Sequence, residues 1–137
     1  MPVEVIDTAN GLGVIVVGSG TVTADELLRG DELAYQPEAK LSKLKYMLND
    51  YRAATFTNVT EEDLLKSIKN DTEAAKINPD IAVAVVAEED LIFGMSRVWE
   101  TLVDVHEVQF KTFTTRSLKE AKAWIKEETG IEVDYAG

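Results

Sequence analysis

The stretch "IAVAVVA", Ile81 to Ala87, constrains the fold of this chain more than any other. It is continuously apolar and rich in β-branched residues, with no polar residue interrupting it. A strand with one wet face alternates between apolar and polar residues, whereas a strand covered on both faces reads as an unbroken apolar run. We therefore expect a buried central strand of a mainly parallel sheet over these residues.

Strand and helix patterns alternate along the rest of the chain. Asn10-Gly11 predicts a tight antiparallel turn between the first two strands. A helix with a broad apolar face is expected over residues 90–103. The other expected strands cover residues 3–7, 14–17, 44–51 and 108–113. The other expected helices follow three residues that can cap a helix N-terminus, namely Thr23, Thr60 and Ser117.

These elements predict an α/β fold that forms a single domain over residues 1–137. Their order is β-β-α-β-α-β-α-β-α. The expected sheet has four to five strands and is mainly parallel, with an antiparallel first strand and helices packed on it. A short segment after the last helix, "IEVDY", is either a further strand or a tail.

Composition excludes several classes of function. The net charge is -11, from 25 acidic and 14 basic residues, so the surface repels nucleic acids and anionic lipids. The chain has no cysteine, which excludes disulfides, thiolate metal sites and cysteine nucleophiles. No apolar stretch approaches the roughly 20 residues that cross a bilayer. The first ten residues lack a signal-peptide pattern, so we expect a cytoplasmic protein without membrane insertion.

Gly18-Ser19-Gly20 follows an apolar run and precedes a helix, where a phosphate-binding loop would lie. The dinucleotide fingerprint needs a third glycine three residues after the second, and Thr23 occupies that position. The chain also lacks the Gly-Lys-Ser/Thr tripeptide of a P-loop. We interpret the glycines as a turn or a close contact at a strand end, and we expect no nucleotide cofactor.

Other catalytic patterns are equally weak. His106 is the only histidine, so a multi-histidine metal site cannot form, and we expect it to be a polar residue at a strand start. The nucleophile-elbow pattern G-x-S-x-G is absent from the sequence. Asn49-Asp50 is the best-placed polar pair, because open α/β sheets bind ligands beyond the carboxyl ends of their strands. We predict no catalytic residue, metal or cofactor, and hence a protein that is not an enzyme.

The pattern resembles the SpoIIAA-like, or STAS/SEC14-like, family of small bacterial proteins. The resemblance extends from about Val14 to Lys126 and implies a four- to five-stranded sheet with helices stacked along it. Four stretches carry it: "GSGTVTADEL", "LKYMLND", "DIAVAVVAEED" and "VQFKTFTTRSLKEAKAWI".

The resemblance implies two kinds of function. Anti-sigma-factor antagonists of this superfamily carry a phosphorylated serine in the loop after the third strand, but the corresponding residues 51–63 contain none. Thr60 is assigned to helix capping, which leaves Thr55 and Thr57 as the phospho-acceptor candidates. The lipid-exchange branch implies an apolar pocket beneath the helices. "LIFGMSRVWETLV" either lines such a pocket or forms plain core.

We therefore predict a non-enzymatic cytoplasmic binding or regulatory module that takes a protein partner or a small apolar ligand. The alternative is a phosphorylation-controlled antagonist in a partner-switching pathway. The helix over residues 90–103 carries more apolar residues than one sheet-facing stripe needs. Phe93, Met95 and Trp99 are the candidates for an interface or a pocket wall, and a homodimer is the simplest partner. Alternatively, another part of the chain covers these residues.

Overall fold

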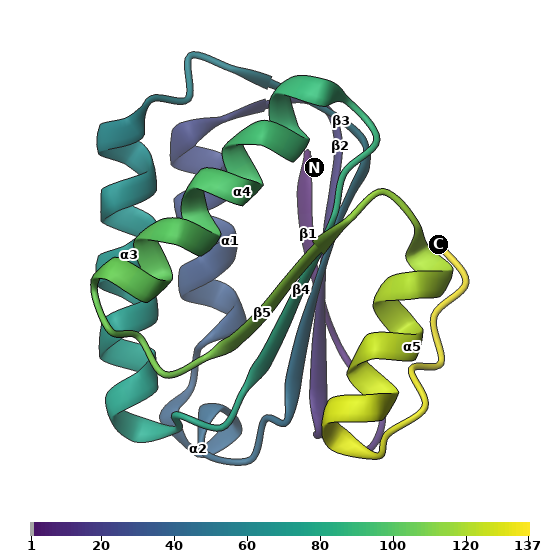
Figure 1. Cartoon of the computed structure of the whole chain (residues 1–137). Helices are drawn as coiled ribbons and strands as arrows, with labels where there is room; N and C mark the ends of the chain where they lie inside the picture. The colour runs from purple at the N-terminus through teal and green to yellow at the C-terminus, as the bar shows by residue number, and fades with distance from the viewer. Residues whose placement is uncertain (1) are drawn as a thin grey trace.

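The computed structural model describes residues 2–137 as a five-stranded sheet between two unequal layers (Figure 1). The strands lie in chain order across the sheet, β1-β2-β3-β4-β5. The first pair is antiparallel and the other pairs are parallel, which confirms the predicted fold class. The strands are β1 (Val3–Asp7), β2 (Gly13–Thr23), β3 (Tyr46–Thr57), β4 (Ala82–Val86) and β5 (Lys111–Thr115).

Three helices cover one face of the sheet, and one helix with the C-terminal tail covers the other (Figure 1). From β2 to β5, each parallel strand lies next to the one before it, always toward the same edge of the sheet. Crossover connections between parallel strands are right-handed, so the helices of these connections all lie on one face. That face carries α1, α3 and α4, and the opposite face carries α5. The helices are α1 (Ala24–Ala34), α2 (Glu38–Leu41), α3 (Glu61–Ile77), α4 (Asp90–Val105) and α5 (Leu118–Thr129).

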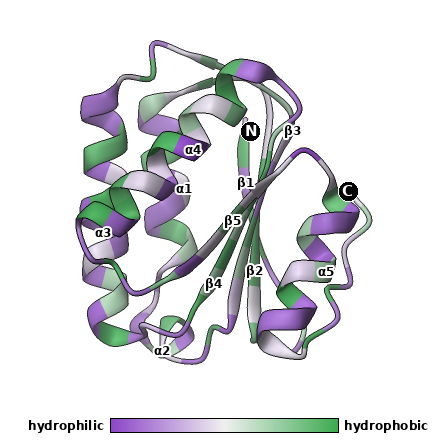
Figure 2. Ribbon diagram, viewed as in Figure 1, coloured by the Kyte–Doolittle hydropathy of each residue, from purple (hydrophilic) through white to green (hydrophobic). Residues whose placement is uncertain are grey.

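The predicted helix caps are present. The Thr23 hydroxyl accepts a hydrogen bond from the Glu26 amide at 3.2 Å, and the Glu26 carboxylate accepts one from the Thr23 amide at 3.0 Å. Thr60 and Asp63 form the same reciprocal pair at the start of α3. Along their length the helices alternate between hydrophobic and hydrophilic residues, as expected for helices with one buried side (Figure 2). Within residues 2–137, none of the helices is both long and apolar enough to cross a bilayer.

Strand β4 is buried on both faces, as its apolar run predicts. It lies between β3 and β5, and each of its five residues is buried. Val83 and Val85 belong to the apolar cluster beneath α1, α3 and α4. Ala82, Ala84 and Val86 belong to the cluster beneath α5. The two clusters explain why no polar residue interrupts the run.

The turn expected at Gly18-Ser19-Gly20 is wrong, because this tripeptide lies inside β2. The strand continues to Thr23 and pairs with an equally long β3, with Ser19 opposite Ala53. A close contact is present at Gly18, where a Cβ would lie 2.8 Å from the Tyr51 ring. The tripeptide therefore belongs to a parallel pair of strands and forms no phosphate loop.

The loop expected after residue 51 is also wrong. Strand β3 extends to Thr57, with a register shift against β2 opposite Gly18. Phe56 packs on the core beneath the helices, so Thr55 and Thr57 point to the opposite face by strand alternation. The two phospho-acceptor candidates thus lie in a paired strand and not in a loop at a helix start.

The remaining differences are smaller, and one of them is the four-residue helix α2, which lies where the sequence predicts no helix. Strand β5 begins at Lys111, later than expected, because Val108 and Phe110 serve as buried residues of the connection that follows α4. His106 is the exposed C-cap residue of α4, so its expected place at a strand start is wrong. Residues 131–137 form a tail without a strand.

Candidate functional site

A cavity of about 80 Å³ lies between the sheet and the three helices that share its face, and it is partly open to solvent. Strands β3 and β4 supply its floor through Met47 and Val85. Its walls are mainly apolar and come from all three helices and the long end of β3. The principal wall residues are Leu27, Leu28, Phe56, Leu64, Met95 and Trp99.

The polar side chains that line this cavity include three acids, of which Asp31 and Asp71 are buried and Asp63, in the first turn of α3, is half-buried. Asp31 comes from α1 and Asp71 from α3, two helices that pack against each other. Ser67 and Asn49 are further polar lining residues. No lysine, arginine or histidine of residues 2–137 lines the cavity. The site is therefore an apolar cavity whose nearest charges are negative.

Asp71 is held by hydrogen bonds from two aromatic side chains. Its side chain is 1% exposed, and its two oxygens accept one bond each, from the Tyr35 hydroxyl at 2.7 Å and from the Trp99 indole N–H at 2.8 Å. These contacts tie α1, α3 and α4 together. Burial raises the pKa of Asp71 to about 6, although both hydrogen bonds act to lower it.

Asp31 is less completely engaged. Its side chain is 9% exposed, and Oδ2 accepts a hydrogen bond from the Ser67 hydroxyl at 2.8 Å. Its other oxygen, Oδ1, accepts none from residues 2–137. Burial and, to a smaller extent, the negative charge of Asp71 raise the pKa of Asp31 well above its usual value. Asp31 therefore has one oxygen free for a ligand.

Asn49 and Tyr51 extend the polar part of the site along β3. The Tyr51 hydroxyl donates to Asn49 Oδ1 at 3.4 Å, and the Asn49 amide donates to the carbonyl of Ala84 at 3.3 Å. The Tyr51 ring meets the Phe56 ring edge-on at 5.3 Å between centroids. Asn49 thus lies in the cavity wall, but in the first half of β3 and not at the strand end where the sequence places it.

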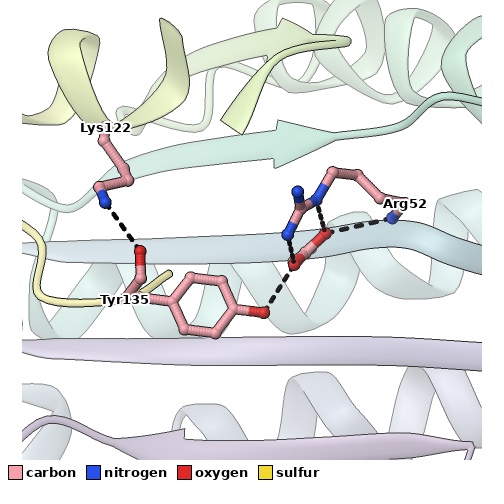
Figure 3. A network of polar contacts seen from close by, with 4 residues as sticks. Arg52, Lys122 and Tyr135 are labelled. Carbon is pink, nitrogen blue, oxygen red and sulfur yellow. Dashed lines mark hydrogen bonds and ion pairs between the residues drawn. The ribbon is translucent and has the colours of Figure 1, made fainter. Parts of the chain in front are cut away.

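Asp50, the other half of the expected pair, points to the opposite face of the sheet. Arg52 donates to both of its carboxylate oxygens at 2.9 Å, and the Tyr135 hydroxyl donates at 2.6 Å (Figure 3). Lys122 donates to the Tyr135 carbonyl at 2.8 Å. Burial alone raises the pKa of Asp50, but the hydrogen bonds from Arg52 and Tyr135 outweigh it and hold the pKa below its usual value. This network fastens the C-terminal tail to the sheet.

The three interface or pocket candidates on α4 separate in space. Met95 and Trp99 are in the cavity wall. Phe93 is half-buried outside it, where the Arg116 guanidinium carbon lies 4.3 Å from the centre of its ring. The sequence predicts exposed apolar side chains at Phe93 and Trp99, but Trp99 is buried and Phe93 is half-buried. The exposed large apolar residues of α4 are Leu91, Val98 and Val105.

The sequence interpretation did not include Asp31 and Asp71, although each leaves a signal. Asp71 lies three residues after Ile68 and four before Ala75, on the apolar stripe of its helix. Asp31 lies four residues after Leu27. An acid at a core-facing helical position is unusual, because burial of an unpaired charge is unfavourable. That periodicity could have identified both residues.

The chain matches no protein-family model, and no curated protein matches it significantly. The resemblance to SpoIIAA-like proteins therefore stays a prediction. Residues 2–137 contain no group of three or more histidine, cysteine or acidic side chains that could hold a metal ion. The cavity offers the fixed carboxylate of Asp71, the less engaged carboxylate of Asp31, the helix-capping carboxylate of Asp63, and apolar and aromatic walls.

Proposed function

We propose that this protein is a binding module that takes a small ligand into the cavity beneath α1, α3 and α4. One observation carries the proposal, namely that apolar walls enclose a few inward polar groups. Small-molecule sites have this composition, because the apolar surface supplies affinity and the polar groups fix orientation. The volume of about 80 Å³ limits the buried part of the ligand to a few heavy atoms, since a cavity of about 150 Å³ holds benzene.

Binding is a better proposal than catalysis for this pair of acids. Acid–base catalysis by two carboxylates needs both groups to reach the substrate. Both oxygens of Asp71 are occupied by Tyr35 and Trp99, so Asp31 alone is available. A cytoplasmic location also belongs to the proposal, since a chain without cysteine fits a reducing compartment.

The phosphorylation-controlled alternative has less support. Thr55 and Thr57 pair with β2 inside a regular strand, where a kinase would have to separate the chain from its neighbour. The protein-partner alternative rests on the exposed line of Leu91, Val98 and Val105 on α4. That line borders the cavity wall at Met95, which lies four residues after Leu91 and three before Val98.

An NMR titration tests the cavity as a binding site. The probes are n-butanol, n-butylammonium and n-butyrate, three molecules of similar size and different charge. We expect at least one of them to shift the side-chain signals of Met95 and Trp99 in a saturable way. Met95→Trp fills the cavity and should abolish these shifts, whereas Thr101→Trp introduces the same side chain at an exposed position six residues further along α4 and should preserve them.

Two results would contradict the proposal. The first is the absence of saturable shifts at cavity residues with all three probes. The second is binding that survives Met95→Trp in a folded protein, because the probe would then occupy another place.

A further inference from the structure

The free oxygen of Asp31 indicates which ligand charge the cavity accepts. Asp31 is about nine-tenths buried and lines the cavity, and its Oδ1 accepts no hydrogen bond from residues 2–137 but is not among their fully enclosed unpartnered atoms, so it keeps accessible surface. A buried carboxylate is normally paired with a cation or saturated with donors, because an unpaired one is unfavourable. Within the described chain, neither an arginine nor a lysine contacts it. The missing partner is a hydrogen-bond donor, preferably a charged one.

The surroundings of Asp31 strengthen this preference. Asp71 lies on the neighbouring helix and contributes a second negative group that the protein has already fixed through Tyr35 and Trp99. Two acids without a nearby positive charge attract a cation and repel an anion. The net charge of -11 also raises the concentration of cations around the whole protein.

The remainder of the cavity requires an apolar ligand body. Met47, Met95 and Leu28 offer aliphatic and thioether surface to the cavity. A hydrated inorganic ion would not remove this apolar surface from water, whereas an apolar ligand chain would. Tyr51, Phe56 and Trp99 add aromatic side chains, to which organic cations bind favourably. The ligand thus combines a positive end with a short apolar segment.

We propose, on the basis of the binding function proposed above, that the cavity takes a small organic cation, a primary ammonium with a short apolar chain. The ammonium donates to Asp31 Oδ1, and the apolar chain lies against the methionine and aromatic walls. Ser67 has a positioning role, because its hydroxyl donates to Oδ2 and thereby orients the carboxylate.

The experiment compares affinities of the three butyl probes for the wild-type chain at pH 7. We expect n-butylammonium to bind at least tenfold more tightly than n-butanol, and n-butyrate to bind more weakly than both. In Asp31→Asn, which retains an acceptor for Ser67, n-butylammonium should lose at least tenfold in affinity while n-butanol is unchanged. Glu32→Gln is the matched control, since it removes one charge at the adjacent exposed residue and should alter neither affinity.

The outcomes separate this inference from the proposed function. Equal affinities for the ammonium and the alcohol, or an Asp31→Asn variant that binds the ammonium as wild type does, would overturn the cation inference and leave the cavity as a neutral site. If no probe shifts the cavity residues, the binding function itself is wrong and the inference falls with it. If Asp31→Asn does not fold, Asp31→Leu carries the same expectation for the two affinities.

Discussion

Asp50 and Asp31 are both buried, on opposite faces of the sheet, but only Asp50 meets an arginine. Asp50 is 4% exposed and accepts hydrogen bonds from Arg52 and Tyr135. Asp31 is 9% exposed and accepts one bond from Ser67. Accordingly, the pKa of Asp50 is lowered and the pKa of Asp31 is raised. Burial and the neighbouring charge of Asp71 raise the pKa of Asp31, whereas the hydrogen bonds from Arg52 and Tyr135 outweigh burial at Asp50.

The difference separates a structural role from a functional one. The Asp50 network joins the C-terminal tail to β3, and each oxygen of the carboxylate has a partner. On the other face, α1, α3 and α4 enclose acids with no basic partner among the cavity residues. Groups with shifted pKa values in a cavity are more often functional than those in a saturated ion pair. This contrast supports the proposed binding function on the three-helix face.

The largest expected loss of stability comes from a new acid that is buried on the three-helix face and has no hydrogen-bond donor nearby. Val83 faces the same apolar cluster as the cavity but is fully buried in β4. Val83→Asp should lower the free energy of unfolding by about 5 kcal/mol, because the new carboxylate has neither donors nor a cavity. Urea denaturation measures this, and Val83→Ala, with an expected loss of about 2 kcal/mol, is the control for lost volume. Equal losses in the two variants would show that this face tolerates an unpaired acid.

Removal of the arginine should make Asp50 resemble Asp31. Arg52→Ala takes away the donors at 2.9 Å and leaves Tyr135 as the remaining side-chain donor to this carboxylate. We expect a loss of about 2 to 3 kcal/mol in unfolding free energy, less than for a fully buried pair because the Arg52 side chain is 31% exposed. The pKa of Asp50, followed by NMR, should rise. An unchanged pKa would mean that Arg52 does not determine its ionisation.

Asp31→Asn should stabilise the protein at neutral pH. The unfolded chain releases the Asp31 proton near pH 3.8, whereas the folded chain holds it to a higher pH. Raising the pH above about 4 therefore favours the unfolded state, which binds fewer protons there. Asp31→Asn should increase the free energy of unfolding at pH 7, and the gain should vanish near pH 3, below the unfolded pKa. A destabilised variant at pH 7 would assign Asp31 a structural role.

The dependence of unfolding free energy on pH should also differ between the acids on the two faces of the sheet. Asp71, with its pKa raised to about 6, contributes a loss of stability between about pH 4 and 6 that Asp31→Asn does not remove. The groups that face these two acids are Tyr35, Ser67, Trp99 and Tyr51, together with each other. Asp50 acts in the opposite sense, because its lowered pKa gives stability that is present above its unfolded pKa and is lost as the pH falls through its folded one.

The smallest expected effect concerns the tail. Tyr135→Phe removes one hydrogen bond to Asp50 and leaves both Arg52 contacts in place. We expect a loss of about 1 kcal/mol in unfolding free energy and faster amide exchange in residues 131–137. The matched substitution Tyr35→Phe removes a hydrogen bond to the fully buried Asp71 and should cost more. If the tail substitution has the larger effect, burial of the accepting carboxylate does not determine which of the two hydrogen bonds contributes more to stability.

Local patterns in the sequence by themselves determined the element order and the buried strand. Thr23, Thr60 and Ser117 satisfy amides within three residues of themselves, so the starts of α1, α3 and α5 could be predicted from a few letters. The apolar run at Ile81 to Ala87 requires cover on both faces wherever it occurs. Such features are local, and the tertiary structure does not alter them.

The tertiary structure alone decided the ends of β2 and β3 and the composition of the site. Gly18-Ser19-Gly20 has the composition of a turn, but residues 53–57 of the neighbouring strand pair with the end of β2 and extend it. Asp31 and Asp71 are 40 residues apart in the sequence and meet only because α1 and α3 pack on the same face. Whether a buried acid meets an arginine or an open cavity depends on residues distant in the chain, and periodicity within one helix contains no information about them.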